Sequence, residues 1–208
     1  RLESGDRLVR AVGRYLTDCW TDQAAGFFIS GGPQPFYLNL TFTAPHTPLQ
    51  APEAALAVFR DRSDLNDAVK TLYAMIRRLD RNIGRLLEQV DRLGLRDNTL
   101  IIFSSDNGPE FGGKGDQCQA RFNCHLHGAK GSTYEGGIRV PAIMRWPDGL
   151  QASAQAEDGF FHMCDWLPTI LSLAGIEVPA SIKLDGVDQS SVLRGEVAPF
   201  DPKRCWQW

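Results

Sequence analysis

A short apolar run that ends in an acid and an amide constrains this chain more than any other feature of its sequence. Residues 99–104 contain no turn-forming residue, and positions 100–103 read Leu-Ile-Ile-Phe. A run of this kind is typical of a strand that is covered on both faces. Asp106 and Asn107 follow directly after it. We therefore expect both side chains at the end of a strand, where open α/β sheets bind their ligands.

The chemistry of this pair suits a metal ion. A carboxylate and a neighbouring amide oxygen are ligands for a hard cation such as Ca²⁺ or Mg²⁺. Taken alone, Asp106-Asn107-Gly108 also fits a plain turn. The choice between a metal site and a turn depends on the segments that accompany the pair.

Two other segments place polar side chains after or before apolar runs. Residues 35–43 predict a second strand, which leads into the sequence Ala-Pro-His-Thr-Pro-Leu with the histidine at His46. Residues 128–141 place Lys130 in a glycine-rich turn before a third apolar run at residues 140–146. Three predicted strands thus bring a histidine, an Asp-Asn pair and a lysine to their ends.

The remaining pattern predicts an α/β protein. Residues 64–93 carry apolar side chains at three- and four-residue steps, which indicates a long helix capped by Ser63 or Asp64. Further helical patterns cover residues 6–29 and 164–174. Helices that alternate with apolar strands favour a largely parallel central sheet between helical layers.

Length and composition fit one domain, or a large part of one. The 208 residues are 43% hydrophobic, enough for one substantial core. The formal net charge is -3 and the basic residues are scattered, so a nucleic-acid partner has no electrostatic support. No apolar run approaches the ~20 residues that a membrane-spanning helix needs.

In combination, three blocks resemble the sulfatase family of the alkaline phosphatase superfamily. They are APHTPL at residues 44–49, SDNG at 105–108 and GAKGSTYEGGIRVP at 128–141, and similar blocks recur in that order in the family. The resemblance extends from Tyr15 to Asp188. It implies an alkaline phosphatase-like fold and hydrolysis of the sulfate monoester of a carbohydrate or aryl alcohol. It also implies a bound metal ion, which is Ca²⁺ or alternatively Mg²⁺. In addition, it implies a formylglycine as a modified residue.

The resemblance assigns roles to four residues. Asp106 and Asn107 are implied to be metal ligands, His46 to contact the sulfate, and Lys130 to contact both the sulfate and the leaving-group oxygen. These residue types suit the reaction, because a sulfate ester is a tetrahedral anion that needs cationic or hydrogen-bond-donating groups around it. By the same resemblance, the whole protein is expected to be periplasmic, secreted or lysosomal.

The family's nucleophile is not found in this sequence. It lies in a C/S-x-P-x-R motif, which none of the five cysteines matches; they are Cys19, Cys118, Cys124, Cys164 and Cys205. We therefore expect residues 1–208 to be a partial sulfatase catalytic domain. It would lack roughly the first third of a domain of usual size, with the nucleophile, and a C-terminal portion. Such a piece is expected to be inactive alone.

Residues 109–128 lack a regular period and predict a substrate-facing loop. In this loop, Cys118, Cys124, His125 and His127 resemble a compact zinc cluster, but their spacing matches no standard site, so a disulfide or free thiols fits better. We interpret His125 and His127 as solvated rather than catalytic. Two other functions stay open. One is a phosphate or phosphonate ester hydrolase of the same superfamily, and the other is a non-catalytic relative that binds sulfated glycans.

Overall fold

The structure, a computed structural model, describes residues 2–4, 7–9, 13–32, 34–110, 121–150 and 161–196. Its chain divides into two units. The first unit is Arg1–Leu95 with Phe103–Ala142, and the second is Arg96–Ile102 with Ile143–Trp208. All four residues to which the resemblance assigns roles belong to the first unit.

The first unit begins with a hairpin and not with the predicted helix. β1 (Leu2–Ser4) pairs antiparallel with β2 (Arg7–Val9), so that Leu2 lies opposite Val9. α1 (Leu16–Ser30) starts only after Gly13, whose φ of +75° lies outside the helical region. The prediction of a helix over residues 6–29 is therefore wrong at residues 7–9 and 13–15, because a short apolar run fits a strand as well as a helix.

The long predicted helix is confirmed as α3 (Asp67–Arg92). Its cap is Asn66, and not Ser63 or Asp64, because the Asn66 side chain accepts a hydrogen bond from the Val69 amide at 2.9 Å. The apolar stripe of α3 forms much of the core of this unit; its buried members include Val69, Leu72, Met75, Leu79 and Val90.

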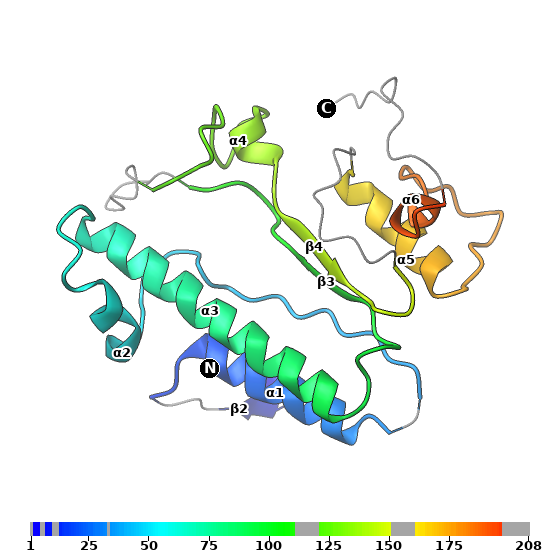
Figure 1. Cartoon of the computed structure of the whole chain (residues 1–208), viewed down its shortest axis with the longest axis horizontal. Coiled ribbons are helices and arrows are strands. Elements are labelled where there is room, and N and C mark those ends of the chain that lie inside the picture. Colours follow the sequence, from blue (N-terminus) through cyan, green and yellow to red (C-terminus); the bar gives the residue numbers. More distant parts are fainter. Residues whose placement is uncertain are drawn as a thin grey trace. The chain divides into compact units, whose positions relative to one another are not determined.

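α1 and α3 lie side by side (Figure 1), and a polar cluster joins them. Asp18 accepts hydrogen bonds from Arg78 Nε at 2.8 Å, from Arg78 Nη2 at 2.6 Å and from Asn82 Nδ2 at 2.7 Å. Burial by itself raises the pKa of Asp18, but these hydrogen bonds outweigh it and hold the pKa below its ordinary value. The carboxylate of Asp18 thus stays charged between the two helices.

The predicted strand at residues 35–43 is not observed. This segment has no regular secondary structure, although Leu38, Leu40 and Phe42 are half-buried and alternate with exposed residues. The alternation is the pattern of a strand, yet no described strand pairs with it, and a strand needs the hydrogen bonds of a neighbour. Two short helices, α2 (Glu53–Leu56) and η1 (Ala57–Phe59), lie between this segment and α3.

The other two predicted strands are present. β3 (Ile101–Ser104) and β4 (Ala142–Arg145) form a two-stranded sheet, and a short helix, α4 (Glu135–Ile138), precedes β4. β3 is half-buried at every position, so it is not the fully covered strand that its sequence predicted. Neither sheet in the described ranges has more than two strands, and the largely parallel central sheet stays a prediction.

The second unit contains η3 (Met163–Asp165), α5 (Trp166–Leu173) and α6 (Ser190–Leu193). The prediction of a helix at residues 164–174 is thereby confirmed with a shorter span. Asp165 is fully buried and accepts hydrogen bonds from the amides of His162 and Val187, both at 2.9 Å. Among the described helices, none has the length and apolarity to cross a membrane.

Candidate active site

Main-chain hydrogen bonds join the segment after β3 to the glycine-rich turn around Lys130. The Gly108 amide donates to the Gly137 carbonyl at 2.8 Å, and the Lys130 amide donates to the Pro109 carbonyl at 2.9 Å. Two blocks that lie some twenty residues apart in the sequence therefore form one local structure.

The glycine-rich turn is also closed on itself. The Gly136 amide donates to the His127 carbonyl at 2.7 Å, and Ser132 Oγ donates to the Ala129 carbonyl at 2.8 Å. A β-carbon on Gly137 would lie 2.2 Å from the Ser132 carbonyl oxygen, which leaves no room for a side chain. The close approach of main-chain atoms thus requires glycine here.

His46 lies between Pro45 and Pro48, in the segment that leads from residues 35–43 toward α2. Its amide donates to the Thr43 carbonyl at 2.8 Å, and its Nδ1 lies 2.7 Å from the Thr47 carbonyl. Because a carbonyl oxygen only accepts, Nδ1 must carry the proton in this bond. In the neutral ring, Nε2 is then the nitrogen left to accept a hydrogen bond.

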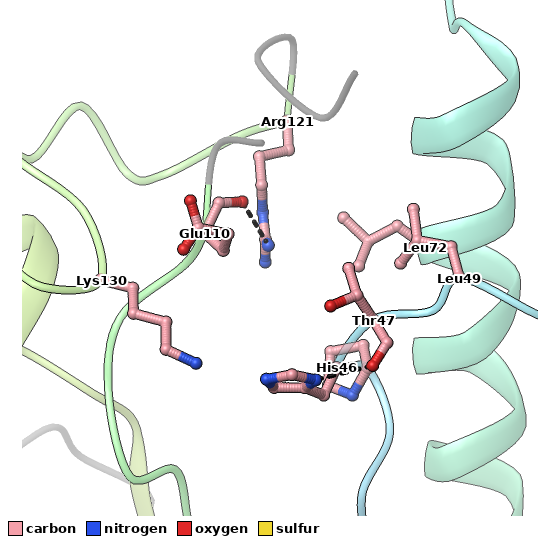
Figure 2. A pocket seen from close by; sticks show the side chains of 8 residues that line it. His46, Thr47, Leu49, Leu72, Glu110, Arg121 and Lys130 are labelled. Atoms are coloured by element: carbon pink, nitrogen blue, oxygen red, sulfur yellow. Dashed lines mark hydrogen bonds between the residues drawn. The ribbon is translucent and has the colours of Figure 1, made fainter. Parts of the chain in front are cut away.

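His46 and Lys130 line one pocket, with a volume of about 90 Å³, and reach into it from opposite sides (Figure 2). A single buried water needs about 10–15 Å³, so the pocket has room for several waters or for one small oxyanion. α3 contributes Leu72 to the wall. The other lining residues are Pro45, Thr47, Leu49, Glu110 and Arg121.

Asp106 and Asn107 follow β3, as the sequence predicts, and do not themselves line this pocket. Asp106 is exposed, and Asn107 is half-buried. Asn107 Nδ2 donates to the Gly108 carbonyl at 2.8 Å, which leaves Oδ1 as an acceptor for a cation.

These two residues fit part of a calcium site. Ca²⁺ takes six to eight oxygen ligands, and Asp106 and Asn107 offer two neighbouring ones. Within the described ranges, no three or more His, Cys, Asp or Glu side chains are grouped to hold a metal. The pair therefore suits the cation but does not complete its coordination.

The loop histidines stand apart from the pocket. The His127 ring packs against Tyr134 with ring centroids 4.3 Å apart, and His125 packs against Phe122 at 5.3 Å. Neither histidine lines the pocket. Cys124 is a free, exposed thiol, and Cys118 lies outside the described residues.

Sequence reasoning missed two charged residues of the pocket, Glu110 and Arg121. Both belong to the aperiodic stretch at residues 109–128, where neither spacing nor motif distinguishes one charged side chain from another. The feature that could have indicated them is their position in a loop between two segments that were predicted to contribute to the site.

Comparisons with known proteins identify the family of this chain. The family model described as Sulfatase matches residues 3–176. The chain is 36% identical over 177 residues to the uncharacterized sulfatase YdeN of Escherichia coli K12, and 34% identical over 185 residues to mouse steryl-sulfatase. These matches cover 83% and 87% of this chain but 30% and 28% of the relatives. The chain thus spans less than a third of the length of these two relatives.

Solved structures show the same relationship. The crystal structure of Ps i-CgsB in complex with k-i-k-neocarrahexaose has a TM-score of 0.82 and 34% identity, and the match covers 91% of this chain and 40% of that one. A phosphonate monoester hydrolase from Silicibacter pomeroyi, at 21% identity and a TM-score of 0.66, shares the fold. Residues 3–176 include all three sequence blocks and both sides of the pocket, and the chain belongs to the sulfatase family.

Proposed function

We propose that the full-length protein removes sulfate from a carbohydrate or aryl sulfate monoester, in a reaction that depends on Ca²⁺ and a formylglycine. The observation that carries this proposal is the pocket shared by His46 and Lys130, in a chain of the sulfatase family. The names of its relatives, steryl-sulfatase and N-acetylgalactosamine-6-sulfatase, are consistent with such a reaction. We also propose a periplasmic, secreted or lysosomal location.

In this proposal, Lys130 and His46 stabilise the charge of the reacting group. The Lys130 ammonium has three N–H donors and can donate to a sulfate oxygen and to the leaving-group oxygen together. The hydrogen bond from His46 Nδ1 to the Thr47 carbonyl fixes the ring, and in the doubly protonated form of the ring Nε2–H is then the donor that is available to a sulfate oxygen. Groups that are held in place before the reaction stabilise a transition state without a further cost of reorganisation.

Asp106 and Asn107 would hold the calcium through their side-chain oxygens. When bound, Ca²⁺ offsets negative charge on the substrate oxygens, and the formylglycine supplies the nucleophile. None of the five cysteines begins the C/S-x-P-x-R motif that is needed for this modification, so the formylglycine is expected outside residues 1–208.

Two other functions remain as rivals. A phosphate or phosphonate ester hydrolase would also use a metal and cationic side chains, and one phosphonate hydrolase shares the fold. A non-catalytic relative would bind a sulfated glycan without hydrolysing it.

The deciding experiment uses the full-length protein with matched sulfate, phosphate and phosphonate monoesters of one aryl alcohol, and a sulfated sugar. We expect the sulfate esters to have the highest kcat/KM, and chelation of Ca²⁺ to abolish turnover. Lys130→Ala should lower kcat on the order of a hundredfold or more, while Lys183→Ala, on an exposed site in the second unit, serves as the control. Preference for the phosphonate would favour the first rival, and binding without hydrolysis would favour the second.

A further inference from the structure

Thr47 presents a hydroxyl group to the pocket that His46 and Lys130 share. The threonine lines this pocket, and Figure 2 shows its side chain pointing toward the open space into which the other two side chains reach. A hydroxyl can both donate and accept hydrogen bonds, so it has the chemistry to bind a polar ligand there. The proposed function uses only the main-chain carbonyl of Thr47.

The two polar groups of Thr47 differ in what they contact. Its carbonyl oxygen accepts the hydrogen bond from His46 Nδ1 at 2.7 Å. Within the described ranges, its hydroxyl is bonded to no other group, so the hydroxyl remains for a ligand. Thr47 therefore orients the imidazole through its main chain and places a further polar group beside it through its side chain.

The local chain limits where this hydroxyl can lie. Pro45 and Pro48 flank the two residues, and each proline ring fixes its own φ. The His46 amide donates to the Thr43 carbonyl at 2.8 Å, which ties the start of this segment to the residues before it. Threonine is branched at its β-carbon, so its χ1 has few accessible values. The hydroxyl is thus restricted to few positions before a ligand binds.

A sulfate ester offers this hydroxyl an acceptor. The non-bridging oxygens of a sulfate monoester share its negative charge and accept hydrogen bonds from several directions. In the proposed function, Lys130 and the doubly protonated His46 donate to some of them. A hydroxyl adds a donor without adding charge, and a hydrogen bond to a charged group is stronger than one between neutral groups. Because Thr47 follows His46 in the chain and lines the same pocket, we expect its donor to reach the same sulfate.

We propose that Thr47 is a further catalytic residue, whose hydroxyl donates a hydrogen bond to a non-bridging oxygen of the sulfate that is removed. This inference rests on the proposed function, because it takes His46 and Lys130 to hold the reacting sulfate. The hydrogen bond is made to the sulfate and not to the alcohol that leaves. Its loss should therefore affect every sulfate ester alike, whatever the alcohol.

The test uses the full-length enzyme with two substrates, an aryl sulfate and a sulfated sugar. Thr47→Val replaces the hydroxyl with a methyl group of similar size, and Thr47→Ser retains the hydroxyl. The control is Thr71→Val, because the Thr71 hydroxyl bonds to the Asp67 carbonyl within α3. For each variant, kcat and KM are measured on both esters, together with the pH profile of kcat/KM.

We expect Thr47→Val to lower kcat/KM about ten- to hundredfold for both esters, the scale of a hydrogen bond to a charged group. Thr47→Ser and Thr71→Val should stay within about threefold of the parent. The pH profile should keep its shape in every variant, because the carbonyl of residue 47 still accepts the hydrogen bond from His46. A changed profile in Thr47→Val would show that the residue acts through His46, and would overturn the direct contact.

Two further results would overturn this inference and leave the proposed function intact. The first is an unchanged kcat/KM of Thr47→Val on both esters. The second is a loss confined to the sulfated sugar, because the hydroxyl would then contact the alcohol that leaves.

Calorimetry with inorganic sulfate separates this inference from the proposed function if the protein hydrolyses neither ester. A Kd for inorganic sulfate that rises about tenfold or more in Thr47→Val would overturn the proposed function alone. An unchanged Kd would overturn both. If Thr47→Val lowers the melting temperature, Thr47→Ser and Thr47→Ala are compared instead. These two variants differ only in the hydroxyl, so the same ratio is expected between them.

Discussion

Gly108 and Gly136 approach so closely that a β-carbon on Gly108 would lie 1.9 Å from the Gly136 carbonyl oxygen. No real β-carbon tolerates that distance, so the two main-chain segments can meet only if residue 108 is glycine. The contact joins the residues that follow β3 to the turn that carries Lys130. The geometry of the candidate site thus depends on a position that has no side chain.

We expect Gly108→Ala to force these two segments apart. Overpacking of this kind costs about 1–3 kcal/mol of stability, and the displacement of Lys130 should lower kcat as well. Gly84→Ala is the matched control, because no atom within 4 Å opposes a β-carbon there and α3 should gain about 0.5–1 kcal/mol. Melting temperature and kcat are measured for both variants. A Gly108→Ala enzyme as stable and active as its parent would contradict the role of this contact.

Asp106→Ala should weaken the response of the full-length enzyme to Ca²⁺. A ligand that binds only the folded state stabilises it by about 2.7 kcal/mol at a concentration of 100 times its Kd. The parent should therefore melt at a higher temperature as Ca²⁺ is added, and the variant should lose most of this increase. Asp80→Ala, on the exposed side of α3, is the control. Equal calcium-dependent melting of Asp106→Ala and the parent would rule out Asp106 as a ligand.

His46 and the loop histidines should differ in their effect on turnover. Loss of a group that stabilises the transition state costs on the order of a hundredfold in kcat, which we expect for His46→Ala. His125→Ala and His127→Ala should stay within about threefold of the parent, because these rings pack against Phe122 and Tyr134 outside the pocket. Steady-state measurement of kcat for all three variants on one sulfate ester tests this prediction. A large loss in His127→Ala, with normal folding, would show that the loop histidines contact the substrate.

The contact between Asp18 and Arg78 predicts a pH-dependent contribution to stability. Because folding lowers the pKa of Asp18 below 3.8, its charged form stabilises the fold above that pH, and this stabilisation is lost as the pH falls through the lowered folded-state pKa. Asp18→Asn should therefore cost about 1–3 kcal/mol at pH 7 and less at pH 3, which lies below the ordinary pKa of 3.8. Denaturant unfolding of both proteins at the two pH values tests this.

The control for this prediction is Asp64→Asn. The hydrogen bond from Arg62 lowers the pKa of Asp64 to about 2, but both side chains are exposed. Exposed ion pairs contribute little to stability, so this variant should unfold like the parent at both pH values. If Asp18→Asn behaved in the same way, the contact between α1 and α3 would have no role in stability.

The fold was predictable where one local pattern decided the structure. The spacing of Val69, Leu72 and Leu79 allows only a helix, and α3 lies there. The alternation at residues 35–43 was real as well, but a strand also depends on a partner elsewhere in the chain, which the local pattern does not specify. The hairpin of β1 and β2 was missed because three-residue strands are too short to show a period.

The site was predictable where its residues lie in sequence blocks that resemble those of a known family. His46 and Lys130 were selected through such blocks, and they line one pocket, although their roles stay predictions. Arg121 was not predictable, because its place in the pocket depends on the Glu110 carbonyl and on the turn of a loop without a period. A main-chain acceptor has no signature in the sequence, since every residue carries one.

The main-chain bond between Lys130 and Pro109 decides which substitutions around the pocket preserve its geometry. Because the Lys130 amide is held by a carbonyl group, the side chains at residues 109, 110 and 121 can be exchanged without removing the atoms that place the lysine. The position of Lys130 and the side chains around it are thus encoded in different atoms of the same few residues. Single substitutions at residues 110 and 121 therefore change the lining of the pocket, while the main-chain atoms that place Lys130 stay the same.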